Sequence, residues 1–213
     1  MKLYYLPIST YSQKALIALN EKELSFEPEI VALGNEEARQ KYRDIYPIGK
    51  VPLLVLDNGH MIPESTIIVE YANQVSDKGP DLIPGDADNR RQVRFRDRMM
   101  DLYLNDSVSS LFFESRKPQA EQNQNLIDKS REKIDVMFGY MDSELAERTW
   151  LMGDDFTMAD CAAAAPLFYA QELHPFGDKS NLAHYARRLF ERPSYQSVLA
   201  EALPMLEKMR AQH

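Results

Sequence analysis

The sequence predicts a small α/β domain followed by a larger domain built only from helices. Short apolar runs alternate with helix-like periodicity over the first third of the chain. A segment with two prolines and two glycines follows at 78–86, and no convincing strand pattern appears after it. We therefore expect one domain at 1–78, a linker at 79–88 and an all-helical domain at 89–213.

The first domain is expected to have the element order β-α-β-α-β-β-α, in a sheet that mixes parallel and antiparallel strands. Its first strand, Lys2–Leu6, is short and rich in tyrosine and leucine. Residues 57–59 read Asp-Asn-Gly, a strong signal for a hairpin turn. The last helix opens near Glu64, and we expect Ile67 and Ile68 to face inward. A first helix follows the first strand, and the other elements are expected at Phe26–Val31, Glu36–Tyr42, Val51–Leu56 and His60–Ile62.

Helical periodicity, interrupted by proline and glycine residues, predicts the elements of the second domain. Thr157 and Asp160 form a capping-box pattern, with Phe156 as a hydrophobic staple. We interpret Thr157 and Asp160 as structural residues of a helix start, not as catalysts. The helices are expected at Asn89–Glu114, Asn123–Glu147, Thr157–Glu172, Leu182–Glu191 and Ser194–Ala211.

Composition excludes several classes of function. The 213 residues include 33 acidic and 25 basic side chains, and a net charge of −8 disfavours nucleic acids and anionic membrane surfaces as partners. One cysteine cannot form an internal disulfide, and four scattered histidines show no metal-ligand spacing, so we expect no metal. No signal-peptide h-region or membrane-length apolar run is visible, which predicts a soluble, cytoplasmic protein.

Three short motifs could carry chemistry, and each also has a purely structural interpretation. Ser9 or Ser12, at a helix start, can donate a hydrogen bond to an anion or thiolate, or can simply cap the helix. A proline at the start of a strand removes a donor, so Val51–Pro52 is either a cis bond facing a cleft or a trans bond at a strand edge. Glu64 and Ser65 can bind a zwitterionic amino acid, or only cap their helix.

The order and spacing of these motifs resemble a known family. Tyr5-x-Pro7-x-Ser9-x-x-Ser12, then Pro47-x-Gly49-Lys50-Val51-Pro52-Leu53, then Glu64-Ser65-x-Ile67-Ile68-x-x-Tyr71 are similar to the thioredoxin-like N-terminal domain of cytosolic glutathione S-transferases. Phe156–Asp160 looks like the capping box of the family's helical domain, and Arg192-Pro193-Ser194 like its usual ending. The resemblance, closest to bacterial serine-class enzymes, therefore covers the whole chain.

The resemblance implies that glutathione is the co-substrate and that Ser9 contacts its sulfur. A hydroxyl donated to the thiolate lowers the pKa of the thiol and increases the fraction of active nucleophile. Tyr5 lies where tyrosine-type enzymes carry their phenol, and Thr10 lies where bacterial cysteine-type enzymes carry their cysteine. Tyr5, Thr10 and Ser12 therefore remain alternatives to Ser9.

The family pattern also implies the rest of the glutathione site. The backbone of Val51, before Pro52, would pair with the cysteinyl unit, while Glu64 and Ser65 would hold the γ-glutamyl end. Lys50 could pair with the glycine carboxylate. Gln40 and Lys41 are further candidates, because related enzymes often carry a histidine or lysine in this segment.

An apolar electrophile would bind between the two domains. The activity implied is thiolate attack on that electrophile, as in detoxification, or a glutathione-dependent isomerisation or dehalogenation. A non-enzymatic interaction or regulatory protein with the same fold is the alternative. The family also implies a homodimer. The pocket candidates are Met99, Tyr103, Phe112, Phe113 and Tyr169.

Overall fold

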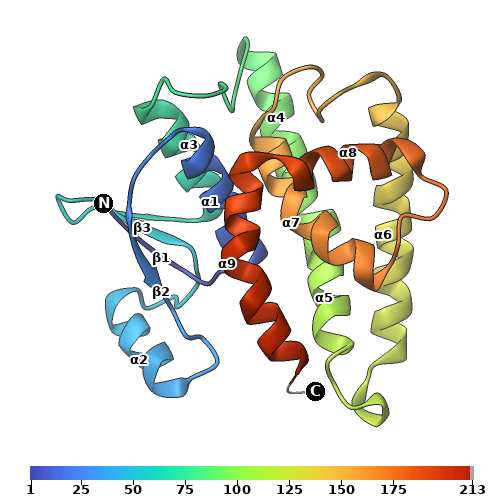
Figure 1. Ribbon diagram of the computed structural model, residues 1–213, viewed down its shortest axis with the longest axis horizontal. Coiled ribbons are helices and arrows are strands. Elements are labelled where there is room, and N and C mark those ends of the chain that lie inside the picture. Colours follow the sequence, from blue (N-terminus) through green and yellow to red (C-terminus); the bar gives the residue numbers. More distant parts are fainter. Residues whose placement is uncertain (212–213) are drawn as a thin grey trace.

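The computed structural model describes residues 1–211. It contains the predicted α/β part followed by the predicted helical part (Figure 1). The predicted order β-α-β-α-β-β-α is confirmed. The N-terminal elements are β1 (Lys2–Tyr5), α1 (Thr10–Glu21), β2 (Glu27–Ile30), α2 (Glu36–Ile45), β3 (Leu53–Val55), β4 (Met61–Pro63) and α3 (Ser65–Val75).

The four strands form a mixed sheet in the order β2-β1-β3-β4. β1 runs parallel to β2 and antiparallel to β3, and β3 runs antiparallel to β4. Leu3 and Tyr5 point to one face of the sheet and are buried there, as the two-residue period of a strand requires. The β-α-β crossover supplies the parallel pair and the hairpin at 57–59 supplies an antiparallel one, as predicted.

The helical domain begins after residues 76–86, which form neither helix nor strand. The predicted helix at 89–114 is a continuous rod, but its middle is a π-helical turn flanked by two α-helices. The elements are α4 (Ala87–Met99), the π-helix η1 (Met100–Asn105), α5 (Asp106–Glu114), η2 (Gln119–Glu121), α6 (Gln124–Glu144), η3 (Leu145–Glu147), α7 (Met158–Leu173), α8 (Ser180–Glu191) and α9 (Pro193–Arg210). The boundaries 1–78, 79–88 and 89–213 stay predictions, and residues 212 and 213 lie outside the described residues.

One continuous core holds the two parts together, because α1 packs against α3 on one side and against α7 and α9 on the other (Figure 1). The alanine run 162–165 lets α7 lie at the centre of the helical domain. Asp160 anchors the start of α7: its carboxylate accepts the N–H of Thr157 at 2.8 Å, that of Leu151 at 2.9 Å and the hydroxyl of Tyr185 at 2.8 Å. Cys161 follows it, fully buried, and burial raises the pKa of its thiol.

The exposure of Ile67 differs from the prediction, and the arginines of α4 form ion pairs. Ile68 is fully buried as predicted, but Ile67 is 49% exposed, so the inward prediction for Ile67 is wrong. The arginine-rich stretch of α4 is largely neutralised, because Arg94 pairs with Glu70 and Arg96 with Glu144. Within residues 1–211, no helix is both long enough and apolar enough to span a membrane.

Candidate functional site

The three sequence motifs meet at one edge of the sheet. Tyr4 near the end of β1 is paired with Leu53 at the start of β3, and Leu53 is paired with Pro63 at the end of β4. The segments that follow β1, precede β3 and follow β4 therefore leave the sheet side by side. These segments carry Ser9, Val51–Pro52 and Glu64–Ser65, respectively. The sheet topology thus assembles one site from motifs separated by more than fifty residues.

Ser9 caps helix α1 and keeps a donor for a ligand. Its backbone is extended (φ −75°, ψ 123°), and its Oγ accepts the N–H of Ser12 at 3.3 Å. A hydroxyl that accepts through a lone pair still has its own proton to donate. The first turn of α1 contains no acidic residue, so the positive end of the helix dipole also favours an anion here.

The alternatives to Ser9 differ in how accessible they are. The Tyr5 hydroxyl donates to Glu201 Oε2 at 2.8 Å on α9, its side chain is 2% exposed, and burial raises the pKa of its phenol. Ser12 is fully buried, and its Oγ accepts the N–H of Leu6 at 3.3 Å. Thr10 is the first residue of α1 and is partly exposed. Of the four candidates, Ser9 and Thr10 are partly exposed, whereas Tyr5 and Ser12 are buried.

The Val51–Pro52 peptide bond is cis, the first of the two alternatives for this motif. The adjoining loop is fixed from α2, because the Tyr42 hydroxyl donates to the carbonyl of Lys50 at 2.6 Å. Val51 is partly buried and the Lys50 side chain is exposed. This places the polar backbone of Val51 at the sheet edge and the exposed cation of Lys50 beside it.

Glu64 occupies a backbone region that favours glycine. Its φ of 71° and ψ of 124° are unusual for a residue with a side chain, and such strain persists only where the surroundings hold it. Within residues 1–211 no side chain caps α3, so the N–H groups of its first turn remain available to an anion. Ser65, the first residue of α3, is 3% exposed at this helix start.

Gln40 and Lys41 make contacts along their own helix, α2. The Gln40 side-chain amide donates to Asp44 at 3.0 Å, and Lys41 Nζ lies 2.8 Å from Glu37. Both side chains are exposed. The contacts of Gln40 and Lys41 therefore do not connect either side chain to the site at the sheet edge.

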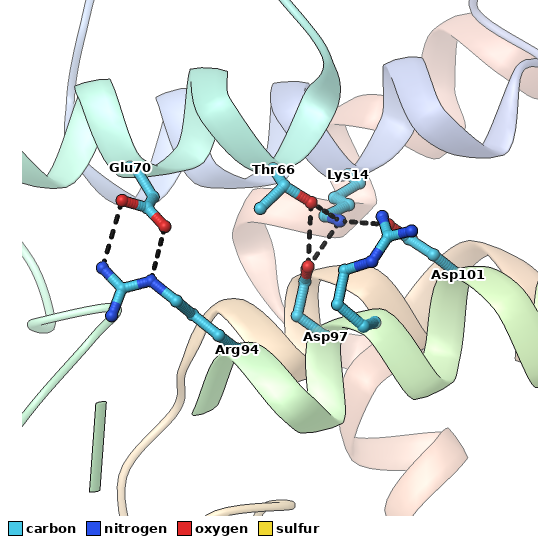
Figure 2. A network of polar contacts seen from close by, with 7 residues as sticks. Lys14, Thr66, Glu70, Arg94, Asp97 and Asp101 are labelled. Atoms are coloured by element: carbon cyan, nitrogen blue, oxygen red, sulfur yellow. Dashed lines mark hydrogen bonds and ion pairs between the residues drawn. The ribbon is translucent and has the colours of Figure 1, made fainter. Parts of the chain in front are cut away.

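A buried ionic network fixes the helices that carry the site (Figure 2). Lys14 Nζ on α1 lies 2.5 Å from Asp97 Oδ1 and 2.9 Å from Asp101 Oδ2, and the hydroxyl of Thr66 on α3 donates to Asp97 at 2.8 Å. Lys14 Nζ also donates to Thr66 at 2.8 Å. The network joins the helix after Ser9 to the helix that begins at Ser65, and both to the helical domain.

Asp97 and Asp101 alternate with arginines along the chain, a pattern typical of a solvated helix, yet the two residues are 0% and 4% exposed. Their spacing of four residues places them on one helix face, which is the signal that could have indicated a shared partner. Burial raises the pKa of Asp101, and the nearby Asp97 carboxylate acts in the same direction.

The electrophile candidates separate into two places. The Tyr169 hydroxyl on α7 donates to the carbonyl of Ile8 at 2.8 Å, next to Ser9. The Phe112 ring lies edge-on to Tyr169 with centroids 5.3 Å apart, and Phe113 adjoins Phe112 at 5.5 Å. These three aromatics therefore form a wall beside the start of α1.

Met99 and Tyr103 do not belong to that wall. Met99 is 7% exposed and belongs to the hydrophobic core. Tyr103 instead lines a shallow cavity of about 450 Å³ together with Leu102, Val136 and Met137, between η1 and α6. Among residues 1–211 no group of three or more His, Cys, Asp or Glu side chains could hold a metal ion.

Comparison with known proteins agrees with this architecture. Family models for the N-terminal and C-terminal domains of glutathione S-transferases match residues 3–78 and 104–193. A crystal structure of a glutathione S-transferase from Methylobacillus flagellatus with glutathione bound is similar, with a TM-score of 0.83 at 28% identity. The alignment covers 92% of this chain and 98% of that one.

Two curated relatives span nearly the whole chain. A stringent starvation protein A homolog of Coxiella burnetii is 29% identical over 209 residues, which cover 95% of this chain and 92% of that protein. Glutathione S-transferase GstB of Escherichia coli is 33% identical over 204 residues, which cover 90% of this chain and 93% of that protein. On these matches, this chain belongs to the glutathione S-transferase family.

Proposed function

We propose that this protein binds glutathione at the sheet edge and activates its thiol for attack on an apolar electrophile. The observation that carries the proposal is the convergence of Ser9, the cis Val51–Pro52 bond and the start of α3 at one edge. Each of the three supplies one type of polar contact that a tripeptide with two carboxylates, an ammonium and a thiol requires.

In this proposal Ser9 donates its hydroxyl proton to the glutathione sulfur. That hydrogen bond and the positive end of the α1 dipole both stabilise the thiolate over the thiol. The thiol proton passes to solvent, and the sulfur attacks the electrophilic carbon while the leaving group departs with its electron pair. Catalysis then comes from a larger thiolate fraction and from holding the two reactants together.

The remaining contacts orient the tripeptide. The backbone of Val51 pairs with the cysteinyl unit in the manner of an added strand. The N–H groups at the start of α3 and the Ser65 hydroxyl take the γ-glutamyl carboxylate, and Glu64 takes its ammonium. Lys50, exposed beside the cis bond, is suited to the glycine carboxylate. Gln40 and Lys41 remain weaker candidates, because α2 residues already engage both.

The aromatic wall beside Ser9 supports an electrophile pocket between the domains. Tyr169 and Phe112 are held in place by the Ile8 carbonyl and by each other, and Phe113 is 66% exposed at their edge. A partly exposed aromatic surface next to the proposed thiolate suits an apolar or aromatic substrate.

We also propose a cytoplasmic homodimer. Ile67 and Met61, 49% and 40% exposed, border a groove of about 750 Å³ over β4, α3 and the start of α4. Phe95, which follows the groove residue Arg94 on α4, is 48% exposed. Apolar side chains gathered this way support burial in a symmetric interface, and light scattering of the purified protein tests the mass directly.

A second candidate function is a regulatory or interaction protein that has kept the fold. The similarity to the relative from Coxiella burnetii, named a stringent starvation protein A homolog, supports this second candidate. Glutathione-dependent isomerisation or dehalogenation is a variant of the first candidate, because it uses the same thiolate. Calorimetric titration with glutathione separates the two classes, since the enzyme must bind it.

The decisive experiment measures the pKa of enzyme-bound glutathione from the ultraviolet absorbance of its thiolate. We expect Ser9→Gly to raise that pKa toward the value of free glutathione, while Thr10→Ala and Tyr5→Phe leave it unchanged. Glycine is chosen because it replaces serine at a helix start at a cost of only a few tenths of a kcal/mol. An unchanged value in Ser9→Gly would remove Ser9 from the mechanism.

A further inference from the structure

Arg116 lies at the outer end of the aromatic wall, in the turn after α5. Its guanidinium carbon is 3.4 Å from the centroid of the Phe112 ring, and its Nη1 donates to the Phe112 carbonyl at 3.3 Å. Phe112 contacts Tyr169, whose hydroxyl binds the carbonyl of Ile8. A continuous set of contacts therefore runs from the residue before Ser9 to this cation.

Arg116 forms no ion pair within residues 1–211, whereas the neighbouring Lys117 pairs with Glu114. The nearby Glu172 is already paired with Arg210, so the three charges together leave an excess of one positive charge. Burial lowers the pKa of Arg116 and Arg210 acts in the same direction, yet an arginine remains protonated at neutral pH.

Arg116 also lines a small hollow with the aromatic wall. The hollow is bordered by side chains from the end of α5, from α7 and from the C-terminal part of α9. The ends of α5 and α9 both lie in the lower part of the view in Figure 1. Besides Arg116, the lining includes Phe112, Tyr169, Glu172 and Arg210.

We propose that Arg116 is a specificity-determining residue that selects aromatic electrophiles carrying a carboxylate. This inference rests on the proposed function, because it places the electrophile against Phe112 and Tyr169 next to the thiolate. The ring of the substrate packs against the aromatic wall, and its carboxylate accepts two parallel hydrogen bonds from the guanidinium. A guanidinium already held over the Phe112 ring loses little rotamer freedom when it binds a carboxylate.

The test compares two substrates that differ only in charge, 4-(chloromethyl)benzoate and its methyl ester. In both, the glutathione sulfur bonds to the benzylic carbon, chloride leaves with the bonding pair and the thiol proton goes to solvent. We expect Arg116→Gln to lower kcat/KM for the carboxylate about tenfold and to change that for the ester less than twofold. Arg116→Lys should restore only part of the loss, because it keeps the positive charge but not the two parallel hydrogen bonds. Lys129→Gln, which removes an exposed cation on α6, should change neither value.

Binding measurements separate the possible failures. Calorimetry with free glutathione and with the two corresponding S-benzyl conjugates should show Arg116→Gln weakening only the carboxylate conjugate. If free glutathione and both conjugates bind but their affinities change equally, the inference is wrong while the proposed function stands. If Arg116→Gln weakens free glutathione itself, Arg116 serves the tripeptide and the inference is also wrong. If none of the three ligands binds the wild-type protein, both the proposed function and the inference are wrong.

Discussion

Two cations have opposite surroundings: Lys14 lies on α1, and Arg116 is connected to the segment before α1 through Phe112 and Tyr169. Lys14 is 1% exposed and has two carboxylates within 3 Å, whereas Arg116 is partly exposed and stacks on an aromatic ring. A buried ammonium without partners would be prohibitively costly, so its acids are part of the fold. A partly solvated guanidinium tolerates the lack of an acid and remains available to a ligand. The comparison assigns stability to Lys14 and selectivity to Arg116.

The largest expected effect is that of Lys14→Met. This change removes the ammonium that both buried carboxylates share and leaves only the Arg98 guanidinium, 3.6 Å from Asp101, so we expect a loss of about 3–5 kcal/mol in the free energy of unfolding. Urea denaturation followed by circular dichroism measures it. The triple variant that also carries Asp97→Asn and Asp101→Asn should recover much of the loss. If the triple variant is less stable than Lys14→Met alone, the carboxylates are not the source of the penalty.

A smaller effect should appear in the pH dependence of stability. Burial and the adjacent Asp97 raise the pKa of Asp101, so the folded protein holds this proton more tightly than the unfolded chain. The resulting stabilisation is complete below the ordinary pKa of about 3.9 and is lost as the pH rises through the raised value. Asp101→Asn has no such proton to lose. Its stability relative to wild type should therefore increase between pH 4 and pH 8.

The matched control for that measurement is Asp154→Asn, because Asp154 is exposed and lies outside the network. Its stability relative to wild type should stay constant over the same pH range. A difference that decreases with pH for Asp101→Asn would contradict the assignment of a raised pKa to this carboxyl.

The comparison also shows which features the sequence could predict. The element order and the three motifs follow from local patterns, because strand periodicity, turn residues and helix starts are encoded within a few residues of one another. Lys14 and Asp101 are 87 residues apart, and their contact depends on how α1 docks onto the helical domain. The same docking buries Asp97, although alternating charges along a helix are typical of a solvated face.

Arg116 was missed for a related reason. A turn after a helix with a mixture of charged residues is ordinarily solvated, and nothing local distinguishes Arg116 from Lys117. The distinction arises because Lys117 turns back to Glu114 while Arg116 lies over Phe112. Only the packing of α5 against α7 creates that aromatic surface next to Ile8.

An exposed ion pair lies beside the buried network, and its loss should affect stability less than that of Lys14 and more than that of Arg116. Arg94 and Glu70 form two hydrogen bonds, at 2.7 and 3.1 Å, on the surface between α4 and α3 (Figure 2). Solvent screens this pair in the isolated chain, so Arg94→Gln should lower the free energy of unfolding of the monomer by only about 0.2–1 kcal/mol. The loss should shrink in 1 M salt, where the screening length is about 3 Å. A cost comparable to that of Lys14→Met would show that exposure does not govern these contributions.

The smallest expected effect on stability is that of Arg116→Gln. The lost cation–π contact is worth about 0.5–1 kcal/mol at an exposed site, and relief of the repulsion from Arg210 offsets part of it. We therefore expect the free energy of unfolding to fall by no more than about 0.5 kcal/mol. Denaturation of Arg116→Gln in parallel with Lys14→Met measures the contrast directly. A loss of several kcal/mol in Arg116→Gln would mean that Arg116 holds the fold together as Lys14 does, and the division of roles between the two cations would be wrong.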